Sequence, residues 1–232
     1  MALVACPTSS IGTVNNLDAA AGVAAFPERL AEDVYFCGFA SRDSYGAASY
    51  FLRTSQGNML VDSPRAASPL LRQIGDLGGV RWMFLTHRDD VTDHLKFRER
   101  FGCERILHRA DVTSETSGIE RTVDGLDPVP LTSDLTIVPV PGHTRGSAAL
   151  LYKDSILFTG DHLWWSTEME ALDASREVCW YSWPQQIRSM ERLLDLRFEW
   201  ILPGHGDPYR APSAAAMRAG LERLIVRMKC ES

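Results

Sequence analysis

Short apolar runs alternate with turn residues along most of the chain, and their spacing predicts strands first, then alternating helices and strands. Apolar runs at residues 34–40, 47–54 and 58–62 predict a β-meander near the start. The Ser-Gln-Gly segment at 55–57 is typical of a hairpin turn between the last two runs. Residues 1–30 lack this pattern and are expected to form a weakly ordered arm.

Helical periodicity predicts four helices among further strands, and Gly78 and Gly102 would close the first two. The expected helices span residues 66–77, a segment ending near 101, 184–194 and 213–229. The expected strands span residues 80–85, 105–108, 135–140, 147–152, 155–159 and 199–202. Because strand groups followed by a helix and a strand occur twice, we expect an α/β protein with paired sheets covered by helices, in one domain over residues 31–232.

The composition is that of an ordinary globular protein and narrows the classes of function. The 232 residues carry 24 Lys and Arg against 30 Asp and Glu, and the net charge of -6 is spread without charge blocks, so nucleic acid is not an expected partner. The longest apolar runs are far shorter than the roughly 20 residues that span a bilayer, so no membrane segment is expected. The N-terminus has no early Lys or Arg and does not resemble a signal peptide. The five cysteines are widely spaced, which fits reduced thiols, and we expect a cytoplasmic protein.

Four of the six histidines lie at or just beyond predicted strand ends, where open α/β sheets build their sites. These histidines are His87, His94, His143 and His205. Asp161 follows another predicted strand in the same way. Imidazoles and carboxylates that meet at strand ends suit one or two divalent cations. His108, after a short strand, is instead expected to be solvated or to cap a turn.

These segments, in their order along the chain, resemble the motifs of the metallo-β-lactamase superfamily, in particular its glyoxalase II-like branch. The matching segments are Thr86-His87-Arg88-Asp89 with Asp93-His94, Pro141-Gly142-His143-Thr144, Thr159-Gly160-Asp161 and Gly204-His205-Gly206. The resemblance extends over residues 33–210. It implies a four-layer αβ/βα sandwich with one or two metal ions in a cleft along the sheet edges.

The resemblance also implies a set of metal ligands. It places His87 and His143 on one ion and Asp161 between the two ions as a bridge. The implied ligands of the other ion are Asp93, His94 and His205. On the same grounds, Asp93 and Asp161 are the expected catalytic carboxylates.

The first motif departs from the superfamily pattern His-x-His-x-Asp-His, because this chain has the longer segment HRDDVTDH from His87 to His94. When the pattern is anchored at His87, its second histidine becomes Asp89, which we expect to be a ligand. Asp90 is the competing candidate. If a helix has begun there, Asp89 and Asp93 share one face; alternatively, Asp89, Asp90 or both cap the helix that follows.

The expected activity is hydrolysis of an ester, thioester, lactone or amide of a small molecule by a metal-bound hydroxide. An additional carboxylate ligand lowers the Lewis acidity of the metal pair and favours manganese or iron, with zinc as the third candidate. A Ser or Cys nucleophile is a poorer fit, since the chain has no Gly-x-Ser-x-Gly segment and no cysteine near the motifs.

The sequence also contains candidates for substrate contact, namely His162, Trp164, Trp165 and Arg145. The two tryptophans could equally pack an insertion onto the sheet, and Arg145 could pair with a surface acid. Two other classes of function are open. One is a non-haem iron redox enzyme, similar to the flavodiiron or persulfide-oxygenase branches of the superfamily. The other is a binding protein that has kept the fold without catalysis.

Overall fold

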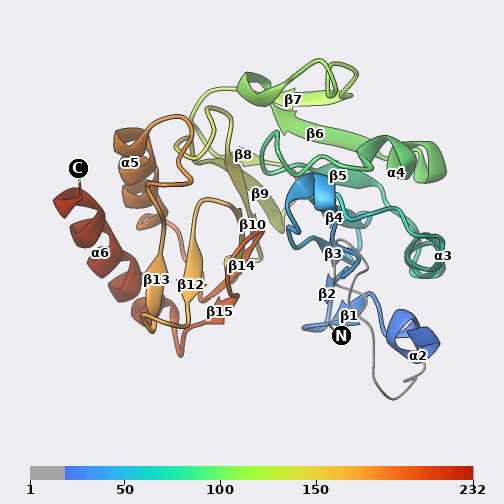
Figure 1. The fold of residues 1–232 in the computed structure, drawn as a ribbon, viewed down its shortest axis with the longest axis horizontal. Helices are drawn as coiled ribbons and strands as arrows, with labels where there is room; N and C mark the ends of the chain where they lie inside the picture. The colour runs from blue at the N-terminus through green and yellow to red at the C-terminus, as the bar shows by residue number, and fades with distance from the viewer. Residues whose placement is uncertain (1–18, 232) are drawn as a thin grey trace. The chain divides into compact units, whose positions relative to one another are not determined.

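The structure, a computed structural model, describes residues 19–231 and forms two compact units (Figure 1). Of the described residues, the first unit comprises those from 19 to Leu85 together with Asp89–Ile106 and Gly118–Arg121. The second unit comprises Thr86–Arg88, Leu107–Ser117 and the chain from Thr122 onwards. One domain over residues 31–232 therefore stays a prediction.

The predicted N-terminal arm is described only in part. Residues 1–18 lie outside the described residues. The remainder contains a short helix, α2 (Ala19–Ala24), and a strand, β1 (Glu28–Arg29), which pairs with the first strand of the predicted meander. The sequence did not indicate either element.

The first sheet has seven strands that are neighbours in chain order. After β1 they are β2 (Val34–Phe36), β3 (Tyr50–Leu52), β4 (Met59–Val61), β5 (Trp82–Phe84), β6 (Glu104–His108) and β7 (Arg121–Val123). Strands β2 to β4 form the expected antiparallel meander, β1 adds to it antiparallel, and β5 and β6 join in parallel. Every residue of β3, β4 and β5 is buried, which explains why these strands are continuous apolar runs.

Helix α3 is shorter than the predicted 66–77 segment, whereas α4 ends at residue 101 as predicted, and the ends of both helices follow from local chemistry. Helix α3 (Ser68–Asp76) has a proline in its first turn, where the missing N–H costs nothing. Helix α4 (His94–Phe101) ends at Gly102, whose φ of 67° is in the left-handed region that favours glycine. A 3-10 turn, η1 (Arg42–Ser44), precedes β3.

The second unit is built on a six-stranded sheet with the order β15-β14-β11-β10-β9-β8. Its strands are β8 (Val129–Pro130), β9 (Leu135–Pro139), β10 (Ala148–Tyr152), β11 (Ile156–Gly160), β14 (Trp200–Pro203) and β15 (Tyr209–Arg210). A separate hairpin consists of β12 (Trp164–Ser166) and β13 (Ala171–Asp173). The sequence predicted the four central strands but not β8, β15 or the hairpin.

Helices α5 (Trp183–Leu193) and α6 (Ala214–Cys230) contact each other and pack on this sheet (Figure 1). Their apolar faces form one core with the strands, in which Leu157, Met190 and Leu224 are almost completely buried. Each helix starts at a serine whose side chain accepts a hydrogen bond from a backbone N–H of the first turn. A 3-10 turn, η2 (Arg109–Asp111), follows β6.

The α/β fold class predicted from the sequence is confirmed, because helices occur between or after the strands of both large sheets in chain order. No helix within residues 19–231 has the length and apolar character that a membrane crossing requires.

The packing of α4 gives a test of the first unit. Phe97 is fully buried and its ring lies 6.4 Å from that of Phe101, whereas Leu95 on the same helix is 52% exposed. We expect Phe97→Ala to lower the free energy of unfolding by about 3–5 kcal/mol, and Leu95→Ala by about 0.5 kcal/mol or less. Urea unfolding of the two variants measures the difference, and equal losses would contradict the burial of Phe97.

Candidate metal centre

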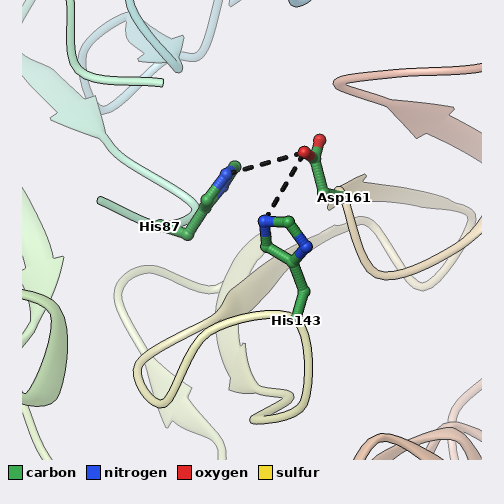
Figure 2. Close-up of side chains that lie close together, drawn as sticks. All are labelled: His87, His143 and Asp161. Atoms are coloured by element: carbon green, nitrogen blue, oxygen red, sulfur yellow. Dashed lines mark ion pairs between the residues drawn. The ribbon is translucent and has the colours of Figure 1, made fainter. Parts of the chain in front are cut away.

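Three of the predicted ligands come together in the second unit, each from the end of a strand. His87 follows β5, His143 follows β9, and Asp161 directly follows β11. Figure 2 shows the three side chains pointing toward one another. Oδ2 of Asp161 lies 3.7 Å from Nε2 of His87 and 3.6 Å from Nε2 of His143, and the donor atoms all lie within 4.8 Å of one another.

The tautomer of His143 follows from its second ring nitrogen. Nδ1 of His143 lies 2.5 Å from the carbonyl oxygen of Val178. A carbonyl can only accept a hydrogen bond, so Nδ1 carries the hydrogen and donates it. In the neutral imidazole, Nε2 then presents its lone pair to Asp161. This is the tautomer that a metal-binding imidazole uses when its other nitrogen bonds a backbone carbonyl.

His87 is held in a comparable way. It is 1% exposed, and its Nδ1 lies 2.9 Å from the hydroxyl oxygen of Thr86. The segment itself is anchored by the backbone, since the carbonyl of Thr86 accepts from the N–H of Ala148 on β10. The rings of His87 and His143 meet edge to face, with their centroids 4.8 Å apart.

Asp161 reaches this position because the strand before it ends at a glycine. Gly160 has a φ of 51°, and a Cβ built on it would lie 2.5 Å from the side-chain oxygen of Thr86. Any larger residue would therefore separate Asp161 from the His87 segment. The side chain of Asp161 is 13% exposed, and its Oδ1 is buried with no hydrogen-bond partner among the described residues.

The cluster fits a divalent cation. In the neutral form of His143, the Nε2 lone pair and a carboxylate oxygen of Asp161 are both acceptors 3.6 Å apart, and a proton or a metal cation between them removes their repulsion. Two ligand atoms about 2.1 Å from a tetrahedral ion are about 3.4 Å apart, close to the separations observed here. Two imidazoles and one carboxylate leave at least one coordination position for water or substrate.

His205, predicted as a ligand of the other ion, lies near the same carboxylate. Its Nε2 is 3.9 Å from Oδ2 of Asp161, and its side chain is 36% exposed. It follows β14 in a turn where Gly206 has a φ of 82°. The second unit therefore brings three predicted histidine ligands, His87, His143 and His205, to one carboxylate oxygen of a fourth predicted ligand, Asp161.

The remaining predicted ligands belong to the first unit, where Asp93 already has two partners. Its Oδ2 accepts from the N–H of Ala66 at 2.7 Å, and its Oδ1 pairs with Nζ of Lys96 at 2.8 Å. The contact with Ala66 ties the start of α4 to the segment before α3, whereas the contact with Lys96 lies within the first turn of α4. The role of Asp93 as a metal ligand and catalytic carboxylate stays a prediction.

His94 is buried against an arginine. Nη1 of Arg105 lies 2.9 Å from Nδ1 of His94, and because a guanidinium only donates, Nδ1 accepts. A neutral imidazole then carries its hydrogen on Nε2, which is the opposite of what binding a metal through Nε2 requires. Glu120 holds Arg105 through both Nε and Nη2. Burial alone would raise the pKa of Glu120, but hydrogen bonds from Arg105 and Arg98 outweigh it and lower the pKa to about 2.

The structure corrects one assumption about Asp89 and Asp90. Helix α4 begins at His94 with Asp93 as its N-cap residue, so the helix does not yet include Asp89, and neither Asp89 nor Asp90 occupies the cap position. The condition under which Asp89 and Asp93 would share a helix face is therefore not met, and the alternative that Asp89 or Asp90 caps α4 is wrong. Asp90 is 1% exposed whereas Asp89 is half-buried, and a buried carboxylate requires compensating partners. Whether Asp89 or Asp90 is a metal ligand stays a prediction.

Two of the predicted substrate contacts are buried or stacked on a neighbour in the structure. His162 is 1% exposed, and burial, then His143 and Arg192, lower its pKa to about 3. Trp165 stacks on Tyr209 with ring centroids 3.9 Å apart. Trp164, also on β12, is half-buried. Arg145 is exposed and stays a candidate.

A tryptophan not singled out from the sequence lies beside the centre. The ring of Trp180 is 62% exposed and its centroid is 6.2 Å from that of His143. The backbone fixes this segment, because the N–H of Tyr181 donates to the carbonyl of His143 and that of Ser182 to Gly142. The cluster of tryptophans around residues 180–183 was the available signal, but it did not show which ring is exposed.

His108 acts as a cap, one of the two roles expected for it. Its Nδ1 accepts from the N–H of Ala110 at the start of η2, and its Nε2 lies 3.1 Å from the carbonyl oxygen of Gly125.

Sequence comparison gives one informative relative, while no family model matches the chain. The chain is 30% identical over 130 residues to a hydroxyacylglutathione hydrolase of Hyphomonas neptunium. The match covers 53% of this chain and 49% of the relative, so the chain spans about half the length of the curated relative it matches.

Solved structures define the fold. The DIM-1 metallo-β-lactamase has a TM-score of 0.63 at 19% identity, with 84% of this chain and 95% of that chain covered. ETHE1 from Myxococcus xanthus has a TM-score of 0.58 at 21% identity, with 84% and 91% covered. The chain therefore has the metallo-β-lactamase fold, and the resemblance identified from its motifs is confirmed at the level of fold.

Substitution of the proposed ligands tests the cluster as a metal site. We expect His143→Ala and Asp161→Ala to fold normally by circular dichroism but to lose bound metal. Removing a ligand should weaken metal affinity by more than the roughly 10–100-fold that loss of an outer partner costs. Asp195→Ala, an exposed carboxylate after α5, is the matched control. Full metal retention in both test variants would disprove the cluster as a metal site.

Proposed function

We propose that the chain is a metal-dependent hydrolase that cleaves an ester, thioester, lactone or amide of a small molecule in the cytoplasm. The observation that carries this proposal is the arrangement of His87, His143 and Asp161, three donor groups at strand ends that face one point. The similarity to a hydroxyacylglutathione hydrolase and the fold of a metallo-β-lactamase both support hydrolysis as the reaction class.

The residues of the chain hold and orient the reacting groups. A divalent ion bound by this cluster would polarise a substrate carbonyl and lower the pKa of a coordinated water. The carbonyl of Val178 fixes the ring of His143, and Thr86 contacts the ring of His87. Oδ1 of Asp161, buried and without a protein partner among the described residues, is placed to accept a hydrogen from water.

The number and identity of the ions are part of the proposal. The His87, His143 and Asp161 cluster accounts for one ion, and its nitrogen and oxygen donors suit zinc, manganese or iron. A second ion would use the ligands implied by the motifs, namely Asp93, His94 and His205 with Asp89 or Asp90. Because Arg105 occupies Nδ1 of His94, we favour a single tightly bound ion.

An iron redox enzyme is the second candidate. The two carboxylates Asp89 and Asp90 in the first motif favour a harder metal such as iron, and the fold is also similar to that of ETHE1. This candidate differs from the hydrolase in needing an oxidant and in using a redox-active metal.

Metal analysis followed by a substrate panel tests the function. Elemental analysis of the purified protein, before and after supplementation, should give about one zinc or manganese per chain, and the loaded protein should hydrolyse members of an ester, thioester and lactone panel. Bound iron with oxygen uptake and no hydrolysis would replace the proposal with the redox enzyme. No metal after supplementation would replace it with a binding protein.

Trp180 is our candidate for the main apolar contact of the substrate. It exposes a large ring 6.2 Å from a proposed metal ligand, while Tyr181 beside it is 48% exposed. Exposed aromatic surface next to a site commonly contacts ligand. The other tryptophans near the site are half-buried or, like Trp165, stacked on a neighbour.

We expect Trp180→Ala to raise KM about tenfold with a smaller change in kcat, which corresponds to roughly 1.5 kcal/mol of lost aromatic contact. Trp180→Phe should recover most of the loss. Val226→Ala, which removes an exposed apolar side chain on α6, is the control and should leave KM unchanged. An unchanged KM in Trp180→Ala for every active substrate would rule out the contact.

A further inference from the structure

A buried carboxylate in the second unit lies behind the candidate metal centre and has no role in the proposed reaction. Asp111 ends the 3-10 turn η2 and is 1% exposed. Its sequence context contains no motif that points to metal binding. An ionised carboxylate is costly to bury unless its oxygens accept several hydrogen bonds, so the partners of Asp111 indicate what it does.

Both oxygens of Asp111 bind the two segments that carry the imidazoles. Oδ2 accepts from the N–H of Arg88 at 3.1 Å and from the hydroxyl of Thr144 at 2.5 Å. Oδ1 accepts from the N–H of Gly146 at 2.7 Å. Arg88 directly follows His87, and Thr144 directly follows His143. One carboxylate therefore joins the residue after each of the two proposed histidine ligands.

The turn after His143 approaches Asp111 closely at Gly146. A Cβ built on Gly146 would lie 2.7 Å from Cγ of Asp111 and 2.8 Å from its backbone nitrogen, so only glycine allows this approach. Ser147 braces the same turn, because its hydroxyl lies 2.7 Å from that of Thr144 and accepts from the Thr144 N–H. Since the Thr144 hydroxyl donates to Asp111, it accepts from Ser147, and each group has a consistent partner.

Asp111 is itself positioned independently of the two histidine segments. His108 accepts from the N–H of Ala110, and its Nε2 donates to the carbonyl of Gly125. The two bonds require the same tautomer, with the hydrogen on Nε2. His108 thereby caps the start of η2 and also joins it to the loop at Gly125.

We propose that Asp111 is a positioning residue that sets the distance between His87 and His143 and so determines the metal affinity of the centre. This inference rests on the proposed function, because it assumes that the two histidines bind a metal. Asp111 does not touch the cluster, and it acts through the backbone of Arg88 and Gly146 and the side chain of Thr144.

Asp111→Asn is the sharpest test, because it keeps the size of the side chain but replaces one acceptor oxygen with an NH2 donor. Oδ1 accepts from the backbone N–H of Gly146 and Oδ2 from that of Arg88. In either orientation of the Asn amide, its NH2 group therefore faces one of these backbone N–H groups, and two donors meet without an acceptor. We expect zinc affinity, measured by competition with a chelating dye, to fall about 10–100-fold, the range for loss of an outer-shell partner. The visible spectrum of the cobalt-substituted protein should shift as well.

Thr144 provides a second pair of variants in case Asp111→Asn does not fold. Thr144→Val removes the hydroxyl donor and should weaken zinc binding, whereas Thr144→Ser keeps it and should bind as the parent does. Asp195→Asn, the same chemical change at an exposed position, should have no effect.

Each result separates this inference from the function it rests on. Parent-like zinc affinity and cobalt spectrum in both Asp111→Asn and Thr144→Val, even with a lower Tm of the metal-free protein, would show a structural role only and overturn the inference. Absence of zinc binding by the parent chain would overturn the proposed function together with the inference.

Discussion

The electrostatic relation between His143 and Asp161 is the constraint on which the candidate centre depends. In the neutral imidazole, the hydrogen bond from Nδ1 to the carbonyl of Val178 leaves a lone pair on Nε2, and this lone pair faces a carboxylate oxygen 3.6 Å away. Two acceptors held at this distance in a largely buried site repel each other unless a proton or a metal cation lies between them. His87 approaches the same oxygen from another strand end, which brings a second imidazole nitrogen to the proposed metal position.

The fold brings these groups together by using close backbone approaches at strand ends. Gly160 lets β11 end against Thr86, and Gly146 lets the turn after His143 close onto Asp111. Neither position has room for a side chain. The apolar core beneath α5 and α6 supports the strands, while buried hydrogen bonds rather than apolar contacts set the positions of the histidine segments. Geometry at the centre therefore depends on a few directional contacts.

The sequence predicted the parts of the site that have local signals. The central strands are apolar runs, and His87, His143 and Asp161 follow three of them in turns with recognisable residues. The order of these motifs was enough to indicate the metallo-β-lactamase fold, which the solved structures confirm. The sequence indicated where α4 ends but not where it starts, because the polar residues before His94 do not show where helical hydrogen bonding begins.

The sequence did not predict features that depend on distant partners. Asp111 accepts hydrogen bonds from residues 23, 33 and 35 positions away. Arg105, which donates to Nδ1 of His94, is itself bound by Glu120, 15 positions further on. No local pattern reveals such pairs. His162 was considered as a substrate contact because it follows Asp161, but neighbouring residues at a strand end point in different directions, and its ring is buried.

Anomalous diffraction from crystals of the metal-loaded protein, collected at the absorption edge of the bound element, tests the central claim most directly. The expected result is a peak within about 2.2 Å of Nε2 of His87, Nε2 of His143 and a carboxylate oxygen of Asp161. A peak at another group of residues, with these three side chains bonded only to protein atoms, would contradict it.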